Sequence, residues 1–301
     1  MKIVFIGSVS SSEVVLKELI NEKLDIKMVF ALDESVSENV SGYRPIDVIA
    51  EKNNIPFTKF TKINDEKNIQ IIKEIAPDYI FVIGLSQLVS QQIISTAKNG
   101  VIGFHPTPLP KFRGRAAMVW QVLLGIHETK CSMFFIDAGT DTGDVIAQEP
   151  YQIDDTDYAE DIERKLLDAI APLTRQVIRK IKSGNVFAWK QNEEEAVYLL
   201  KRTPDDGIID WNKGINEIHK LIRAVSRPYP GAFSYYDGGH KIIIWRAEMR
   251  ENKKYIGFPG QIAAIENGTM DIVCTDGLLH VTEYENVDGK RLFAGHRLTE
   301  K

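Results

Sequence analysis

The sequence is poor in cysteine and shows no cluster of metal-binding side chains. Only two of its 301 residues are cysteines, Cys131 and Cys274, and they form no Cys-x-x-Cys pair. Each lies in an apolar run, so we expect two small buried side chains rather than reactive thiols. The histidines other than His105 are scattered without the spacing of metal ligands, so we predict no metal site.

Long apolar runs and an excess of positive charge are also missing. No segment reaches the apolar length that spans a bilayer, and the apolar start, residues 1–7, is too short for a signal peptide. The 42 acidic residues outnumber the 37 lysines and arginines, and the net charge of -5 gives no general attraction to nucleic acid or acidic membranes. We therefore expect a cytoplasmic protein without a nucleic-acid or membrane partner.

The first part of the chain alternates apolar strands with amphipathic helices, which predicts an α/β domain, residues 1–190, with a largely parallel sheet covered by helices on both faces. The longest expected helix, Ile162–Ile181, is strongly amphipathic. The other expected helices follow Ser11 or Ser12 and cover Ile46–Asn53 and Ile69–Ala76, and the strands are Ile3–Ile6, Lys27–Leu32, Tyr79–Ile83, Val101–Phe104 and Ser132–Ile136.

The second part, residues 200–301, follows Gln191–Glu195, which we interpret as a solvated linker. A helix with Ile215, Ile218, Leu221 and Ile222 on one face precedes five short strands separated by turns such as Asn267-Gly and Asp276-Gly. The pattern predicts a small, OB-like β-barrel domain. The expected strands are Phe233–Tyr236, Lys241–Ala247, Gln261–Ile265, Met270–Cys274 and Leu278–Tyr284.

The turn after the first strand is not a dinucleotide fingerprint. Gly7-Ser-Val-Ser-Ser-Ser lacks the second and third glycines of that motif. Gly7 and Ser8 are therefore candidates for contact with a substrate phosphate, with a plain strand-to-helix turn as the alternative. Ligands of parallel sheets bind beyond the carboxyl ends of the strands, where Gly7, Gly84, His105 and Asp137 are all expected.

A histidine and a carboxylate stand out at this edge. His105 ends an apolar strand before a proline-rich loop, and Asp141 lies in the Gly-rich stretch Asp137-Ala-Gly-Thr-Asp-Thr-Gly-Asp144. A histidine oriented by a carboxylate can move protons during acyl or formyl transfer, so we predict that the pair is catalytic. The alternatives are a histidine that caps a strand end and an aspartate that forms a turn, and Asp137 or Asp144 could take the place of Asp141.

The motifs together resemble the folate-dependent formyltransferase family, over essentially the whole chain. The matching stretches are His105-Pro-Thr-Pro-Leu-Pro-Lys-Phe-Arg-Gly, Asp137–Asp144, Asp210-Trp, Arg223-Ala and Pro228-Tyr-Pro-Gly-Ala-Phe. The resemblance implies a Rossmann-like formyltransferase domain, an OB-like C-terminal domain, and transfer of a formyl group from N10-formyltetrahydrofolate to a primary amine. Gly-Phe-His-Pro-Thr looks most like the nucleotide-sugar N-formyltransferases, in particular the branch associated with pseudaminic-acid-type sugars.

The family's Asn-x-His motif is incomplete here, because Gly103 stands at the asparagine position. The resemblance implies that this asparagine donates a hydrogen bond to the formyl oxygen, and losing one such donor typically costs ~10²–10³ in rate. Our hypothesis is that Gln87 or Ser86 fills the role. The alternative is that both face solvent or cap a helix at Val89.

The resemblance also implies ligand-binding residues. The loop with Gly84, Leu85 and Leu88 corresponds to the segment that cradles the pterin ring, and the candidates in the second loop are Asp137, Gly139 and Thr140. Arg113 and Arg115 are candidates for substrate phosphates, since a guanidinium fork suits them. The alternative for these arginines is an exposed loop or an ion pair that holds the loop shut.

Three functions follow from these observations. The first is an N-formyltransferase acting on a UDP- or dTDP-linked amino-deoxysugar, with N10-formyltetrahydrofolate as co-substrate. The second is methionyl-tRNA formyltransferase, against which stands the acidic segment Leu32–Asn39, where that enzyme is expected to carry a basic loop. The third is a catalytically impaired folate- or nucleotide-binding protein, suggested by Gly103. Apolar strands in the C-terminal domain can support a homodimer.

Overall fold

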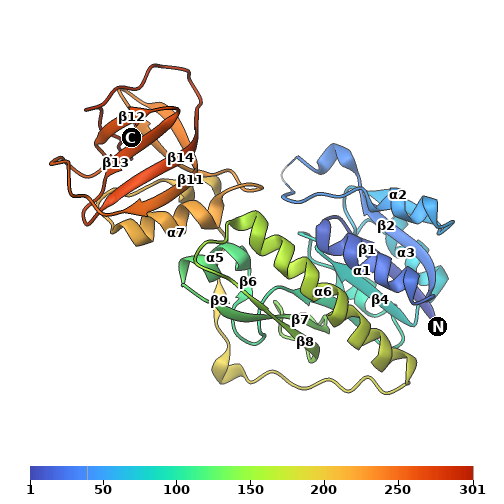
Figure 1. Ribbon diagram of the computed structural model, residues 1–301. Helices are drawn as coiled ribbons and strands as arrows, with labels where there is room; N and C mark the ends of the chain where they lie inside the picture. Colours follow the sequence, from blue (N-terminus) through green and yellow to red (C-terminus); the bar gives the residue numbers. More distant parts are fainter. Residues whose placement is uncertain (39, 301) are drawn as a thin grey trace. The chain divides into compact units, whose positions relative to one another are not determined.

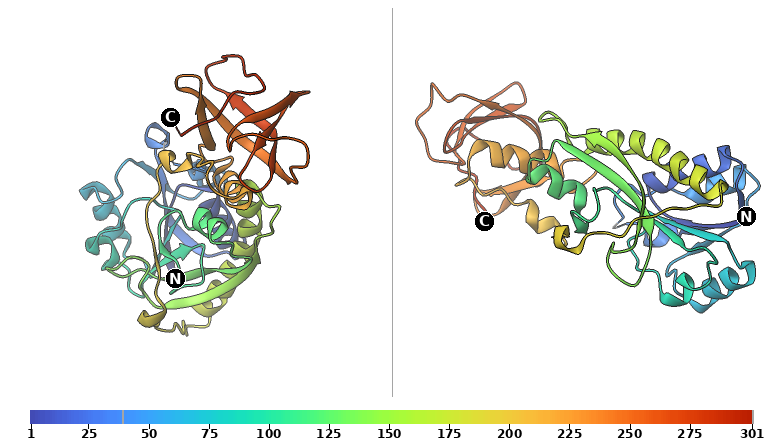
Figure 2. Two further views of the ribbon diagram at one scale, coloured as in Figure 1. Left: turned by 90° about the vertical axis from the view of Figure 1, so that its left-hand side faces the viewer. Right: turned by 90° about the horizontal axis from the view of Figure 1, so that it is seen from below.

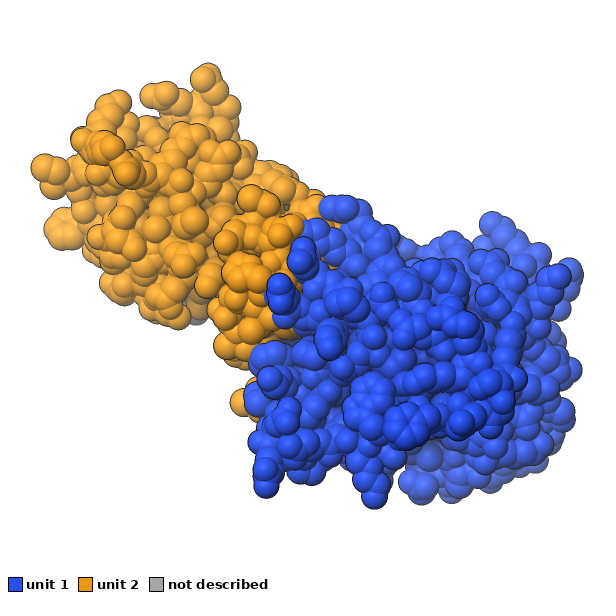
Figure 3. Space-filling view, turned by 60° about the horizontal axis from the view of Figure 1, so that its bottom comes forward, with its two compact units in different colours: residues 1–117, 128–152, 164–199 blue, residues 118–127, 153–163, 200–301 orange. Residues whose placement is uncertain are grey.

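The computed structural model describes residues 1–38 and 40–300, so Asn39, at the end of the acidic segment, and Lys301, at the end of the expected second domain, lie outside the described residues. The chain forms two compact units (Figure 3). The first consists of residues 1–117, 128–152 and 164–199, and the second of residues 118–127, 153–163 and 200–301. The first unit therefore extends beyond the expected boundary at residue 190, to residue 199. Residues 118–127 and 153–163, which were expected in the first domain, group with the second unit.

A seven-stranded sheet forms the centre of the first unit, in the order β3-β2-β1-β4-β5-β7-β8. The pairs from β3 to β5 are parallel, and β7 and β8 continue the sheet as antiparallel strands. The strands are β1 (Lys2–Gly7), β2 (Asp25–Leu32), β3 (Phe57–Phe60), β4 (Tyr79–Ile83), β5 (Val101–His105), β7 (Glu128–Phe135) and β8 (Val145–Gln152). The expected Rossmann-like arrangement is confirmed.

Helices cover both faces of this sheet, because its central strands are apolar on both sides. On one face, Ile69 and Ile72 of α3 and Ile93 of α4 pack against strand residues that include Val4 and Ile6. Figure 2 shows α1 and α6 on the opposite face. The helices are α1 (Ser10–Asn21), α2 (Ile46–Lys52), α3 (Glu66–Ile75), α4 (Gln91–Ile94) and α6 (Ala159–Lys182).

The second unit is built on an antiparallel sheet of five strands in the order β10-β11-β14-β13-β12, with α7 (Ile215–Val225) packed on it (orange to red in Figure 1). The C-terminal residues join the two edges of the sheet: Leu298 donates to Gly260 beside β12, and Thr299 exchanges hydrogen bonds with Tyr235 of β10. The sheet is thereby closed toward a barrel, as expected. The strands are β10 (Ala232–Tyr236), β11 (His240–Arg250), β12 (Ile262–Glu266), β13 (Thr269–Val273) and β14 (Leu278–Asn286).

Several elements were not expected from the sequence alone, among them β3, β8, α4 and four short elements that lie close together in the chain or near the catalytic candidates. Two of these four are the strands β6 (Arg113–Gly114) and β9 (Tyr198–Leu199), which pair in parallel, and the others are α5 (Ala117–Leu123) and the 3-10 turn Glu193–Glu195. The β6–β9 pair lies next to the catalytic candidates and becomes important below. Within residues 1–38 and 40–300, no helix is long and apolar enough to cross a membrane, and no group of three potential metal ligands gathers.

Both thiols are expected to be unreactive in the folded protein. Cys131 and Cys274 are buried, and burial raises the pKa of each thiol to about 12, so the reactive thiolate is scarce at neutral pH. An aromatic disulfide reagent added to the native protein should release almost no chromophore, and both cysteines should react after denaturation in guanidinium. A rapidly reacting thiol in the native protein would contradict this assignment.

Candidate active site

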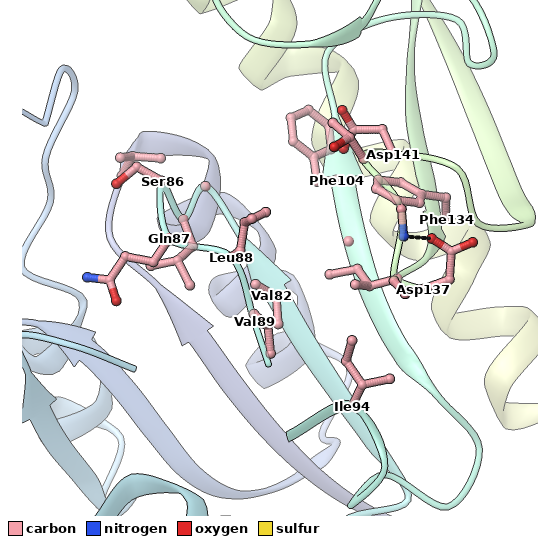
Figure 4. Close-up of a pocket in the computed structure, with 18 of the residues that line it drawn as sticks. Val82, Ser86, Gln87, Leu88, Val89, Ile94, Phe104, Phe134, Asp137 and Asp141 are labelled. Atoms are coloured by element: carbon pink, nitrogen blue, oxygen red, sulfur yellow. Dashed lines mark hydrogen bonds between the residues drawn. The ribbon is translucent and has the colours of Figure 1, made fainter. Parts of the chain in front are cut away.

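A cavity of about 580 Å³ lies at the carboxyl ends of β1, β4 and β5, in the first unit. Two loops form much of its rim, the one that follows β4 and the one that follows β7 (Figure 4). Its lining is mostly apolar, and that suits a flat aromatic ligand held by a few polar groups. The apolar lining residues include Val82, Leu88, Val89, Ile94, Phe104 and Phe134.

The six residues expected to bind a cofactor all line this cavity. They are Gly84, Leu85, Leu88, Asp137, Gly139 and Thr140. The second loop is fixed from within, because the Asp137 carboxylate accepts hydrogen bonds from the Gly139 amide at 3.0 Å and from the Thr142 hydroxyl at 2.6 Å. Leu88 is 82% exposed, and an exposed apolar side chain at the edge of a cavity is a candidate for contact with a ligand.

The structure brings His105 and Asp141 together, although they come from different loops. His105 Nδ1 lies 3.6 Å from Asp141 Oδ2, and the same carboxylate oxygen accepts a hydrogen bond from the Gly114 amide at 2.8 Å. His105 Nε2 donates to the carbonyl of Phe112 at 2.8 Å. Asp141 itself has a left-handed backbone, with φ of 55°, a conformation that aspartate tolerates better than most residues.

From the sequence we expected His105 to move protons and Asp141 to orient it, but the geometry places Asp141, not His105, at the cavity. Asp141 lines the cavity and keeps 21% of its side chain exposed, whereas His105 is buried and does not belong to the lining. Both ring nitrogens of His105 face protein groups, so in this arrangement the histidine does not itself present a nitrogen to the cavity. A proton arriving from the cavity would meet the Asp141 carboxylate first and the imidazole behind it.

Gly103, at the family's asparagine position, has no room for a side chain here. A Cβ atom at this residue would lie 2.8 Å from Ile136 Cγ1 and 3.1 Å from Phe134 Cε1. The apolar side chains of Ile136 and Phe134 thus occupy the place toward which an asparagine would extend. The replacement is therefore accommodated by the packing around it, and any donor to the formyl oxygen must come from elsewhere.

The hypothesis that Gln87 supplies that donor is wrong in this structure. The Gln87 side chain is fixed on the loop after β3: its Oε1 accepts from the Ile63 amide at 2.9 Å and its Nε2 donates to the Thr61 carbonyl at 2.7 Å. Figure 4 shows it pointing away from Phe104 and Asp141. Ser86 is exposed at the cavity, on the side away from Asp141, and the expected helix cap at Val89 is replaced by α4, which begins at Gln91.

Gly7 and Ser8 form a plain turn, so their assignment to substrate binding is also corrected. Both are buried, Ser8 to 1% exposure. The Ser8 amide donates to the Ser12 hydroxyl at 2.9 Å and its own hydroxyl donates to the Gly84 carbonyl at 2.7 Å, which leaves neither group for a phosphate. The turn instead joins the ends of β1 and β4 beneath the cavity.

Arg113 is not placed to bind a substrate phosphate. Its side chain is fully buried, and its guanidinium donates to Gln191, Glu193 and Tyr198 at 2.7–3.0 Å. This is the alternative expected from the sequence, an ion pair that holds the loop. Arg115 is exposed, and no partner of its guanidinium is found among the described residues, so it remains the candidate for a phosphate.

The sequence-based analysis missed a contribution from residues 189–199, which we call the strap. We expected Gln191–Glu195 to be a solvated linker, but Gln191 donates to the carbonyls of Asp141 and Gly143 at 2.8 and 2.7 Å. Its partners are 48 and 50 positions away, so no local pattern indicates the contact. The acidic run that suggested a linker does mark exposed residues, yet one of them, Glu193, pairs with the buried Arg113.

Solved structures with a similar fold include three of different kinds. HypX from Aquifex aeolicus, in complex with tetrahydrofolic acid, matches with a TM-score of 0.70 and 17% identity over 95% of this chain, which spans only 44% of the HypX chain. WlaRD, a sugar 3N-formyl transferase in the presence of dTDP and 5-N-formyl-THF, matches with a TM-score of 0.69 and 20% identity over 95% of this chain and 98% of its own. Methionyl-tRNA formyltransferase from Clostridium thermocellum matches with a TM-score of 0.60 and 21% identity over 92% and 100%.

At these identities the solved structures show a common fold and no more. Two family models match the sequence itself. The formyl transferase model covers residues 1–178, and the model of the formyl transferase C-terminal domain covers residues 201–297. These matches take in both catalytic candidates and nearly the whole chain. The chain therefore belongs to the formyl transferase family of enzymes.

Proposed function

We propose that this chain transfers the formyl group of N10-formyltetrahydrofolate to the primary amine of a nucleotide-linked amino-deoxysugar, with UDP or dTDP as the nucleotide. The observation that carries the proposal is the apolar cavity with the Asp141 carboxylate in its lining and His105 directly behind that carboxylate. Such a site can hold a flat donor molecule next to a group that takes up a proton.

The cavity suits the folate. Apolar side chains such as Val82, Leu88 and Ile94 offer contacts to the faces of a pterin ring, and the loops that carry Gly84 and Gly139 bring backbone groups to the rim, where they can meet its polar edge. HypX and WlaRD, which share the fold, were solved with a tetrahydrofolate compound, and this supports the same class of ligand here.

The carboxylate–histidine pair accounts for the protons of the reaction. The amine nitrogen forms a bond to the formyl carbon, the bond from that carbon to N10 breaks, and one proton moves from the amine to N10. Asp141 accepts the proton at the cavity, and His105 can take it up on Nδ1, since Nε2 already donates to Phe112. A positioned acid–base group of this kind typically contributes ~10²–10⁴ in rate.

The formyl oxygen needs a donor other than residue 103. The cavity has hydroxyl groups on Ser41, Ser86 and Thr140, for which no hydrogen-bond partner is found among the described residues. Thr140 directly precedes Asp141 in the chain, whereas Ser86 lies on the other side of the cavity (Figure 4). Thr140 is therefore the hydroxyl best placed by the chain to reach a formyl group that faces Asp141.

Two similar solved structures support a sugar nucleotide as the amine acceptor. Besides WlaRD, the fold is shared by the N-formyltransferase from Helicobacter canadensis, solved with folinic acid and dTDP-3-aminofucose, at 18% identity over 95% of this chain and 100% of its own. The methionyl-tRNA formyltransferase shares it as well, so tRNA is the second candidate. A net charge of -5 and the acidic residues Asp33 and Glu34 after β2 favour the sugar nucleotide, since tRNA binding requires basic surface.

A formylation assay read by mass spectrometry tests the proposal. N10-formyltetrahydrofolate is incubated with the protein and with UDP- and dTDP-linked 3-amino and 4-amino deoxysugars, and methionyl-tRNA is tested in parallel. A product heavier by one CO group on a sugar nucleotide is the expected result. Formylation of the tRNA alone would replace the sugar by the second candidate, and tetrahydrofolate binding without any product would indicate a catalytically impaired protein.

A further inference from the structure

The strap lies across both catalytic loops of the first unit. At one end Trp189 exchanges two backbone hydrogen bonds with Val145, just after the Asp141 loop. At the other end β9 pairs in parallel with β6, and the Arg115 amide donates to the Leu199 carbonyl. The approach is so close that a Cβ atom at Gly114 would lie 2.4 Å from the Leu199 carbonyl oxygen. This contact fixes Gly114, whose amide donates to Asp141.

Gln191 is the residue of the strap that joins the two loops through its side chain. Its Nε2 donates to the carbonyls of Asp141 and Gly143, and its Oε1 accepts from Arg113 Nε at 3.0 Å and Nη2 at 2.8 Å. One amide thus makes four contacts, two as donor and two as acceptor. Glutamine and asparagine are the side chains that can do this, because an amide has two donor hydrogens and an acceptor oxygen with two lone pairs.

We propose that Gln191 is a positioning residue of the formyl transfer site, which holds Asp141 where its carboxylate faces His105. This inference rests on the proposed function. Asp141 has a left-handed backbone at the turn of its loop. Gln191 Nε2 donates hydrogen bonds to the carbonyls of Asp141 and Gly143, the residues before and after Thr142. Gln191 holds the backbone carbonyl of Asp141, and the Gly114 amide holds its carboxylate. Because Gly114 is paired with Leu199 of the strap, the strap positions both the backbone and the side chain of Asp141.

The buried arginine orients Gln191 in turn. Arg113 has no exposed surface, and Glu193 accepts from both of its terminal nitrogens, at 2.9 and 2.7 Å, while Tyr198 accepts at 2.7 Å. The guanidinium leaves Gln191 one choice of amide orientation, with the oxygen toward Arg113 and the nitrogen toward the two carbonyls. The sequence-based expectation of a phosphate-binding Arg113 is thereby replaced by a role in holding the strap.

The test is the substitution Gln191→Glu in the full chain. A carboxylate still accepts from Arg113, but it cannot donate and would face the carbonyls of Asp141 and Gly143 with negative charge. The kcat of formyl transfer should fall about 10- to 100-fold, as expected for a misplaced catalytic group, while the KM for the folate changes less than about twofold. The matched control is Asn192→Asp, the same amide-to-carboxylate change one residue on, where the exposed side chain contacts only the turn Glu193–Glu195: its Oδ1 accepts from the Glu194 amide and its Nδ2 donates to the Glu195 carboxylate.

A second readout does not depend on turnover. The sequence contains six histidines, so their imidazole signals can be resolved by NMR, and a His105→Gln variant identifies the one of interest. We expect the His105 ring signals to move in Gln191→Glu and to remain in place in Asn192→Asp, because only the first change displaces Asp141. If the native protein formylates none of the acceptors, the proposed function fails, and the NMR comparison still tests whether Gln191 sets the position of Asp141.

Two results would overturn the inference. One is a Gln191→Glu protein with unchanged kcat and unchanged His105 signals. The other is an equal loss of kcat and of thermal stability in Gln191→Glu and Asn192→Asp, which would show that the strap acts only as a structural tie. Should Gln191→Glu not fold, Gln191→Ala removes the same donors without adding charge. Its kcat and His105 signals can then be compared with those of the native protein and of Asn192→Asp.

Discussion

Replacing Asp141 by asparagine is expected to lower kcat by about 10²–10⁴, the contribution of one positioned acid–base group. Asparagine tolerates the left-handed backbone at this position, and its amide oxygen can still accept from the Gly114 amide, so the loop should keep its shape. What disappears is the negative charge 3.6 Å from His105 Nδ1 and with it the group that accepts the proton. The measurement is kcat and KM in the formylation assay, with KM for the folate nearly unchanged.

Two further variants sharpen this prediction. Asp144→Asn removes a carboxylate from the same loop, one that does not line the cavity, and should keep kcat within about twofold, as a typical surface change would. His105→Gln should cost about as much as Asp141→Asn, and the double variant little more than either, because residues that act as a unit are not additive. Full activity of Asp141→Asn, or a larger loss in Asp144→Asn, would show that the wrong carboxylate had been assigned.

The sheet could be predicted from the sequence because its signal is local. Strands such as β4 and β14 are short apolar or alternating runs bounded by turns, and the expected Tyr79–Ile83 agrees with the observed strand at both ends. The parallel order then places the residues that follow the strands at one edge. This reasoning brings Gly84 and Asp137 to the cavity rim without any knowledge of the side-chain contacts.

The polar residues at that edge were less predictable, for a physical reason. A buried or half-buried polar side chain is satisfied by whichever backbone groups come within reach, and these lie far away in the sequence. Gln87 bonds to residues 24 and 26 positions away, Arg113 to residues up to 85 positions away, and Ser8 to Gly84. Their chemistry suits a ligand equally well, so only the fold distinguishes the two roles.

Restoring the family's asparagine by Gly103→Asn is expected to damage the protein rather than improve it. A side chain at residue 103 would lie within 2.8 Å of Ile136 and 3.1 Å of Phe134, and forcing extra atoms into a packed site typically costs about 1–3 kcal/mol. The melting temperature should fall by several degrees, and kcat should fall because Ile136 and Phe134 line the cavity. The control is Gly184→Asn in an exposed turn, where no atom lies near the added side chain and the only cost is the left-handed backbone with φ of 73°, which asparagine tolerates better than most residues. It should lose less stability than Gly103→Asn and keep its kcat.

Shortening Ile136 to alanine should offset the loss of stability caused by Gly103→Asn. Ile136→Ala removes the Cγ1 atom that the new side chain would meet, so Gly103→Asn combined with Ile136→Ala should be more stable than the sum of the two single changes predicts. Contacting residues typically show a coupling of about 0.5–3 kcal/mol, which denaturant unfolding of the four proteins can resolve. With room for its amide beside the Asp141 loop, the asparagine would then supply a second donor to the formyl oxygen besides the Thr140 hydroxyl, and kcat should rise above that of Ile136→Ala. Additive losses in stability would show instead that Ile136 does not occupy the place of the missing asparagine, and that the site is organised around a different donor.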